Sequence, residues 1–136
     1  SSGFDGFYTY FASTGFVYGS TIRNWLKMCE YAKLHHKISI LSIGPGYNDN
    51  RIRPWNKHNN RDRDHGKYYN HMFQMALNVL PTALSITSYN EWGEGTQIEP
   101  AIPYEIQGKN NKKGKLIGQK EEYKYLDYGS EGPYTY

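Results

Sequence analysis

Apolar and polar positions recur with two different periods along this chain, and the change of period divides it into strands and helices. Three short segments have the apolar, aromatic and β-branched character of strands: residues 4–11, 38–43 and 83–89. Between them, apolar residues return every three or four positions. This spacing predicts one helix from a cap at Ser20 to the basic residues 35–37, and a second from Lys67 to Leu80, before Pro81.

Strands that alternate with helices indicate parallel pairing through right-handed crossovers, as in a (β/α)8 barrel of the TIM type or a doubly wound sheet. Three strands are too few for either fold, and a complete barrel takes ~250 residues. We therefore predict an α/β fold in which residues 1–136 are a partial domain, covering roughly the C-terminal half of a (β/α)8 barrel.

Composition narrows the kind of site that such a sheet carries. The chain is only 38% hydrophobic, which is low for parallel strands buried on both faces, yet 16% of its residues are aromatic, with 14 Tyr and 3 Trp. A polar, aromatic-rich chain suits a carbohydrate-binding cleft. Its net charge of +3 owes much to a lysine-rich segment over residues 107–124, for which a solvated loop is the simplest interpretation.

Cysteine, histidine and hydropathy patterns exclude several other classes of site. Cys29 is the single cysteine, so an internal disulfide or a multi-cysteine metal site is excluded, and its helical position predicts a buried thiol. The spacing of His58, His65 and His71 matches no zinc motif. No apolar run reaches the ~18 residues of a membrane span, and no signal-peptide pattern opens the chain. We expect any anchor or targeting segment to lie outside these residues.

Two carboxylates follow the third predicted strand, and they are the strongest chemical signal in the chain. Glu91 and Glu94 lie three residues apart, so a helical turn would place them on one face. Parallel folds bind substrates at the carboxyl ends of their strands. Glycoside hydrolysis uses two such carboxylates, and this spacing favours the ~5–5.5 Å separation of retaining enzymes. The simpler alternative is that one glutamate pairs with Arg53 or caps a turn.

The long polar segment after the second predicted strand contains four arginines: Arg51, Arg53, Arg61 and Arg63. They suit either a lining for sugar hydroxyls or a nucleic-acid surface. Acidic residues such as Asp49 and Asp62 dilute the positive field, so we expect no nucleic-acid partner. Scattered loop arginines most often pair with neighbouring acids. The segment 44–46, Gly-Pro-Gly, lacks the ending of a phosphate-binding loop and is better explained as a sharp strand exit.

Five segments together resemble glycoside hydrolase family 99, the endo-α-1,2-mannosidases and mannanases: residues 3–6, 8–11, 42–47, 52–56 and 85–100. The similarity covers most of the chain and ends near residues 125–128. It implies a barrel enzyme that cuts internal mannosidic bonds with retention and needs no metal or cofactor. Its substrate would be an oligosaccharide or N-glycan, and in animals its place of action would be the Golgi, with any membrane attachment through a missing N-terminal anchor.

The resemblance also implies roles for individual residues. Glu91 is similar to the base that takes the proton of the sugar 2-hydroxyl, and Glu94 to the general acid, with a 1,2-anhydro sugar between the two steps. The residues that resemble substrate-binding or supporting groups are Tyr10, Arg53, Asn90, Tyr47 and Trp92. Tyr10 and Arg53 would contact Glu91 and the bound sugar, and Asn90 would bind sugar hydroxyls. Trp92 would pack beneath the site, or equally belong to the core.

Two departures from the family pattern limit these implications. Gly93 stands where many members have His, so a contact to a neighbouring sugar is absent. The N-terminal half of the barrel is also missing, which exposes unpaired strand edges, so we expect this chain alone to be unstable and inactive. The alternatives to a glucosylated N-glycan mannosidase are a mannan-cleaving specificity of bacterial type, a catalytically silent glycan-binding domain and, more remotely, a basic nucleic-acid module.

Overall fold

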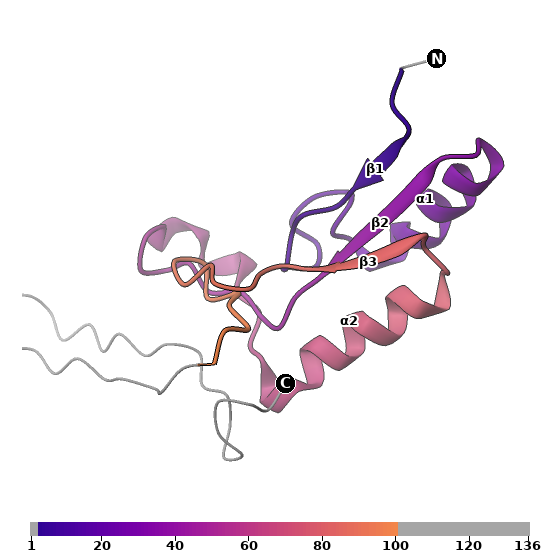
Figure 1. The fold of residues 1–136 in the computed structure, drawn as a ribbon. Helices are drawn as coiled ribbons and strands as arrows, with labels where there is room; N and C mark the ends of the chain where they lie inside the picture. Colours follow the sequence, from indigo (N-terminus) through magenta and orange to yellow (C-terminus); the bar gives the residue numbers. More distant parts are fainter. Residues whose placement is uncertain (1–2, 101–136) are drawn as a thin grey trace, which may run out of the picture.

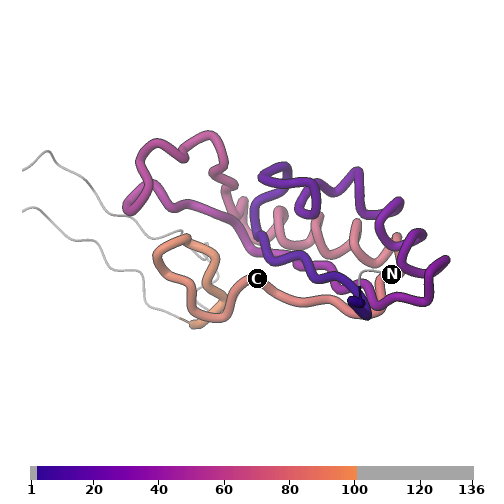
Figure 2. Tube along the Cα trace, turned by 90° about the horizontal axis from the view of Figure 1, so that it is seen from above, coloured from indigo at the N-terminus to yellow at the C-terminus, as the bar shows by residue number. Residues whose placement is uncertain are grey.

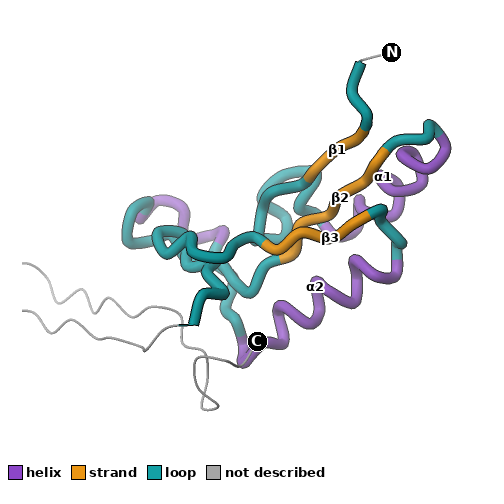
Figure 3. Tube along the Cα trace, viewed as in Figure 1, coloured by secondary structure: helices purple, strands orange, loops and turns teal. Residues whose placement is uncertain are grey.

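The structure is a computed structural model that describes residues 3–100. Two helices and three strands follow one another in the predicted order: β1 (Gly6–Tyr8), α1 (Ile22–Leu34), β2 (Ile38–Ile43), α2 (Lys67–Asn78) and β3 (Ala83–Ile86). Two short 3-10 segments, Pro54–Asn59 and Asp64–Gly66, lie in the long connection between β2 and α2. Figure 1 and Figure 3 show this connection and the segment after β3 gathered at one end of the sheet.

The three strands form one parallel sheet in the order β1-β2-β3. Tyr8 is paired with Ile40, and Ile40 with Ala83, so β2 is the central strand. All three carboxyl ends therefore point to the same edge of the sheet, as the sequence predicted (Figure 1). The predicted α/β character and parallel pairing are confirmed over the described residues.

The core lies between the sheet and the two helices, which occupy the same side of the strands (Figure 2). Its buried members come from both helices and the central strand: Trp25, Cys29, Leu41, Ile43, Met72 and Ala76. Trp25 is fully buried, and its indole nitrogen donates to the carbonyl of Gly19 at 2.7 Å, which satisfies the one polar group of this large aromatic side chain. Cys29 is buried, as predicted.

The opposite face of the sheet has no such cover in the part of the chain that the structure describes. Side chains alternate along a strand, so Phe7 packs against the core while Tyr8 points away from it. Tyr8 is 53% exposed, and Ile38 on β2 is 47% exposed. Unlike an antiparallel sheet with a polar outer face, this sheet presents apolar and aromatic side chains on both sides.

Two predicted strands extend too far along the chain. β1 ends at Tyr8 rather than at residue 11, although Thr9 still donates its N–H to the carbonyl of Ile40 at 3.0 Å. β3 ends at Ile86 rather than at residue 89, because Ser88 leaves the sheet and donates to Thr96 of its own loop at 2.9 Å. The peptide bond between Thr87 and Ser88 is cis. The alternating sequence pattern continued, but the hydrogen-bond partners changed.

Helix ends also differ from the prediction in detail. Thr21, not Ser20, occupies the N-cap position of α1, and the Ser20 hydroxyl instead accepts a hydrogen bond from the N–H of Val17 at 3.0 Å. Ser20 therefore stabilises the turn before the helix rather than the helix end itself. α2 ends at Asn78, and Leu80 has a positive φ of 49° in the turn that leads to β3.

Candidate active site

Residues 88–98, which we call the glutamate loop, fold back on themselves directly after β3. Ser88 and Thr96 bond through main chain, at 2.9 Å, and through their hydroxyls, at 2.8 Å. The N–H of Ile98 donates to the carbonyl of Ser88 at 2.9 Å, and Ser88 Oγ accepts from the N–H of Glu91 at 2.9 Å. Gly95 has a positive φ of 64°, a conformation that glycine adopts without strain. The local sequence thus closes a tight loop that carries both carboxylates.

The spacing of Glu91 and Glu94 produces the predicted turn, though not a helix. The N–H groups of Glu94 and Thr96 both donate to the carbonyl of Glu91 at 3.3 Å. Glu91 is exposed, whereas the Glu94 side chain retains 24% of its exposure. The two carboxylates therefore start from one turn but lie in different surroundings, one exposed and one partly buried.

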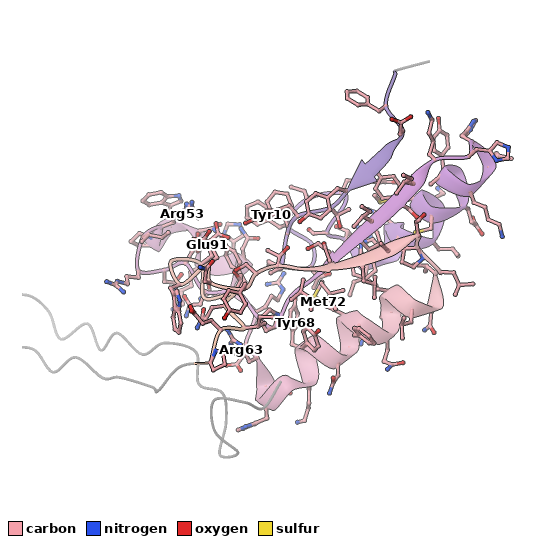
Figure 4. The ribbon with its side chains drawn as sticks, viewed as in Figure 1. Tyr10, Arg53, Arg63, Tyr68, Met72 and Glu91 are labelled. Carbon is pink, nitrogen blue, oxygen red and sulfur yellow. The ribbon has the colours of Figure 1, made fainter. Side chains whose placement is uncertain are left out.

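The glutamate loop is also anchored to the connection that follows β2. The N–H of Asn48 donates to the carbonyl of Glu94 at 2.8 Å. Arg63 is only 5% exposed, and its guanidinium donates to the carbonyls of Gly95, at 3.2 Å, and Gln97 (Figure 4). The sequence left three interpretations of this arginine open: a sugar lining, a nucleic-acid surface, or pairing with a neighbouring acid. Its burial excludes the first two. Arg63 is an internal clamp on main-chain oxygens.

Arg53 joins the same connection to Glu94, the residue that resembles the general acid of the family. Its Nη1 donates to Glu94 Oε1 at 3.0 Å and to Asp49 Oδ2 at 3.2 Å. The hydrogen bonds to Glu94 and Asp49 raise the pKa of Arg53, so it stays a cation at every working pH. The resemblance implied a contact with Glu91, but the structure places Arg53 on Glu94. The simple alternative, a pairing of one glutamate with Arg53, is thus also present, inside the site.

Asp49 gathers polar groups behind Arg53. It is fully buried, and its Oδ2 accepts hydrogen bonds from the Tyr47 hydroxyl at 2.9 Å and from Asn56 Nδ2 at 2.8 Å. Burial raises the pKa of Tyr47 to about 12, and the Asp49 hydrogen bond and the Glu94 charge act in the same direction. The charge of Arg53 opposes this shift. Sequence reasoning missed Asp49 as a member of the site. The available signal was an acid four residues before Arg53.

A cleft of about 310 Å³ opens beside these groups, and Tyr10 lies on its wall. Its lining combines aromatic rings with polar groups: Tyr10, Phe11, Ala12, Phe16, Tyr47, Arg53, Trp55, Asn56, Thr87 and Glu94. Partial burial and the nearby charges of Glu91 and Glu94 raise the pKa of Tyr10, so both carboxylates act on this phenol. Figure 4 shows Tyr10, Arg53 and Glu91 at the same end of the sheet. Trp55 is 77% exposed at the cleft, a position suited to sugar stacking.

The other predicted site residues, Glu91, Asn90 and Trp92, are not among the residues that line this cleft. Asn90 is exposed beside Glu91, and Trp92 is half-buried, with its indole N–H donating to Glu99 Oε2 at 2.9 Å. A β-carbon at Gly93 would lie 3.4 Å from Ile52 Cδ1 and 3.9 Å from Glu91 Oε1. There is room for a β-carbon at this position, near the Glu91 carboxylate.

The structure also bears on the other features considered in the sequence: a further loop arginine, a metal site, a membrane span and the lysine-rich segment. Arg61 donates to the carbonyl of Thr14 at 2.6 Å and to that of Asn60 at 2.7 Å, so it too is engaged within the fold. Over residues 3–100 there is no group of three or more His, Cys, Asp or Glu side chains that could hold a metal ion. The helices of this same part of the chain are too short and too polar to cross a bilayer. The lysine-rich segment 107–124 lies outside the described residues.

An aromatic-lined cleft beside two carboxylates, at the carboxyl edge of a parallel sheet, is the arrangement of a glycoside hydrolase site. All residues of the chain, 1–136, match the family described as glycosyl hydrolase family 99. This chain belongs to that family.

The curated relatives are several times longer than this chain. It is 55% identical over 103 residues to the human glycoprotein endo-alpha-1,2-mannosidase-like protein, covering 76% of this chain and 22% of that protein. It is also 55% identical over 102 residues to the rat glycoprotein endo-alpha-1,2-mannosidase, covering 75% and 22%. A solved GH99 endo-alpha-mannosidase from Bacteroides thetaiotaomicron is 48% identical, with a TM-score of 0.79, over 96% of this chain and 34% of that one. The chain thus spans about a fifth of its curated relatives.

Proposed function

We propose that this chain is part of an endo-acting, retaining α-mannosidase that hydrolyses internal α-1,2-mannosidic bonds of glucosylated high-mannose N-glycans. One observation carries the proposal: Glu94 lies at an aromatic-lined cleft, held by Arg53, one turn after Glu91. The names of the relatives and the family match support the same activity. In an animal cell the complete protein would act in the Golgi.

The two glutamates divide the proton transfers between them. Glu91 takes the proton of the substrate 2-hydroxyl, and the freed oxygen attacks the anomeric carbon to form a 1,2-anhydro sugar. Glu94 gives its proton to the departing glycosidic oxygen. In the second step Glu94 takes a proton from water, which attacks the anomeric carbon, and Glu91 returns a proton to the 2-oxygen. Two inversions at the same carbon give net retention, and general acid–base catalysis supplies both steps.

We also propose that the three described strands continue into a (β/α)8 barrel in the complete protein. The sheet is parallel, and β1 and β3 are edge strands over the described residues. Its face opposite the helices exposes Tyr8 and Ile38. A barrel pairs both edges and covers this face with its own interior. Only there would the cleft be complete.

The test is product analysis with the complete protein that contains this chain. We would incubate it with a monoglucosylated high-mannose glycan and determine the released fragments by mass spectrometry. Release of a glucosyl-mannose disaccharide supports the proposal. An intact glycan together with cleavage of α-mannan would replace the substrate with mannan, and binding of either without cleavage, by folded protein, would identify a silent glycan-binding domain.

A further inference from the structure

Asp49 is a fully buried carboxylate that has no part in the proposed proton transfers of the two glutamates. Burial of a carboxylate is costly unless donors surround it. Three donors converge on its Oδ2, from the Tyr47 hydroxyl, Asn56 Nδ2 and Arg53 Nη1, at 2.9, 2.8 and 3.2 Å. The same Nη1 of Arg53 donates to Glu94 Oε1 at 3.0 Å. One guanidinium nitrogen therefore bridges a buried and a cleft-lining carboxylate.

We propose that Asp49 is a positioning residue: it fixes Arg53 against Glu94 and shares the guanidinium charge, so that Glu94 can carry the proton it must donate. The inference rests on the proposed function, because it assigns Asp49 a part in the proton transfer of Glu94. The Arg53 side chain is 43% exposed, so it needs a fixed partner to hold its orientation. Asp49 can be that partner, because it is fully buried and is itself held by two neutral donors.

The charge count around Glu94 supports this division of the guanidinium charge. A lone arginine at hydrogen-bond distance strongly favours the ionised form of a carboxylate. A general acid in that state has no proton to give. With Asp49 on the same nitrogen, the net charge that Glu94 meets from this pair is near zero, and the geometric restraint on Arg53 is kept. Within residues 3–100, the groups that interact directly with Glu94 here are Arg53, Tyr47 and Tyr10. Asp49 acts on Arg53 and Tyr47, and Glu91 acts on Tyr10.

Tyr10 and Tyr47 are neutral in the working range, since burial and the nearby carboxylates raise the pKa of both. Glu91 is the same residue in every variant of the test. The charge that varies between the wild-type enzyme and Asp49→Asn is thus that of Asp49 alone.

The experiment compares the complete enzyme with its Asp49→Asn variant, using the pH profile of kcat/KM on a glucosylated high-mannose glycan and the crystal structures of both proteins. Asp49→Asn should lower kcat at least tenfold with a smaller change in KM. It should also move the alkaline limb of the profile to lower pH, because the whole Arg53 charge then acts on Glu94. In the crystal structure the Arg53 guanidinium should leave its present position between the two carboxylates and turn toward Glu94.

The matched control is Ser39→Ala. Ser39 is also buried and hydrogen-bonded, to Thr82, but it lies near the opposite end of the sheet. It should leave the pH limb and Arg53 in place. A general loss of packing would lower activity at every pH without moving the limb, so an unmoved limb in Asp49→Asn overturns the inference.

Tyr47→Phe is a second variant that tests the role of Asp49 if Asp49→Asn does not fold. It removes one neutral donor from Asp49, which then draws more strongly on Arg53, so the alkaline limb should move the other way, to higher pH. A shift to lower pH, or none, contradicts the inference. If the complete wild-type enzyme cleaves no glycan, the proposed function fails. The crystal structures still decide the positioning, because an Arg53 that keeps its present bridging position in Asp49→Asn overturns it.

Discussion

The core beneath the sheet and the rim at its carboxyl edge are both buried, but by opposite means. In the core, Leu41 and Met72 are fully buried among apolar neighbours, and transfer from water stabilises them. At the rim, Asp49 and Thr96 are equally buried, yet their surroundings are hydrogen-bond partners. The difference teaches that burial alone does not identify what a residue does. Core substitutions should act on stability, and rim substitutions on chemistry.

The largest separation of the two effects should come from Glu91→Gln and Glu94→Gln in the complete protein. Each keeps the shape of the side chain and removes its proton transfer, so turnover should fall by about 10²–10⁴-fold. The free energy of unfolding should change little, because neither residue belongs to the apolar core. Steady-state kinetics and thermal denaturation of the same preparations measure both. Near-normal turnover in either variant would remove that glutamate from its role.

The core should show the reverse with Leu41→Ala, which leaves a cavity under the central strand. Its cost in unfolding free energy should be about 2–5 kcal/mol, with kcat unaltered at temperatures where the protein is folded. The matched control is Leu34→Ala at the end of α1, where the side chain is 74% exposed, and its effect should stay within about 0.5 kcal/mol. Denaturant titration would test the pair; equal effects would contradict this difference in burial.

Arg63→Lys should affect both properties, since Arg63 is buried and holds the glutamate loop. Lysine keeps the charge but not the planar guanidinium that reaches both Gly95 and Gln97. We expect a loss of about 1.5–3 kcal/mol in stability, the worth of hydrogen bonds to a charged group, together with a lower kcat. Denaturant titration and steady-state kinetics measure the two. Unaltered kcat with lowered stability would show that the loop keeps its geometry without this clamp.

The smallest effect is expected at Gly93. A β-carbon there meets Ile52 Cδ1 at 3.4 Å, a contact that a small shift of one methyl relieves. Gly93→His should therefore leave stability within about 0.5 kcal/mol and alter KM or the preferred sugar beside the cleaved bond more than kcat. Gly93→Ala separates bulk from chemistry. Identical kinetics for glycine, alanine and histidine would mean that this position does not face the sugar.

The order of elements and the carboxylate turn could be predicted from the sequence because both are local. The three- and four-residue period of α1 and α2 and the three-residue spacing of Glu91 and Glu94 need no knowledge of distant segments. The end of β3 could not be predicted in the same way. Thr87 to Tyr89 continue the strand pattern, but Ser88 finds its partner in Thr96, within the loop that follows.

The roles of the arginines depended on contacts that no local pattern contains. Arg63 is buried by carbonyls 32 and 34 positions away, and Arg53 meets Glu94 41 positions away. In the sequence, the spacing of these arginines is typical of residues in a solvated loop. Asp49 was interpreted as diluting positive charge, although its four-residue distance to Arg53 was visible, because charged residues are rarely fully buried.

The anchors of the glutamate loop act mostly on main-chain atoms: Asn48 on the carbonyl of Glu94, and Arg63 on those of Gly95 and Gln97. Peptide groups are the same whatever side chain is attached. Side chains at positions such as Tyr89, Asn90 and Gly93 can therefore change without removing the contacts that hold Glu94 in place. Under the proposed function, we expect substitutions at these positions to alter sugar preference while the main-chain contacts keep Glu94 in place.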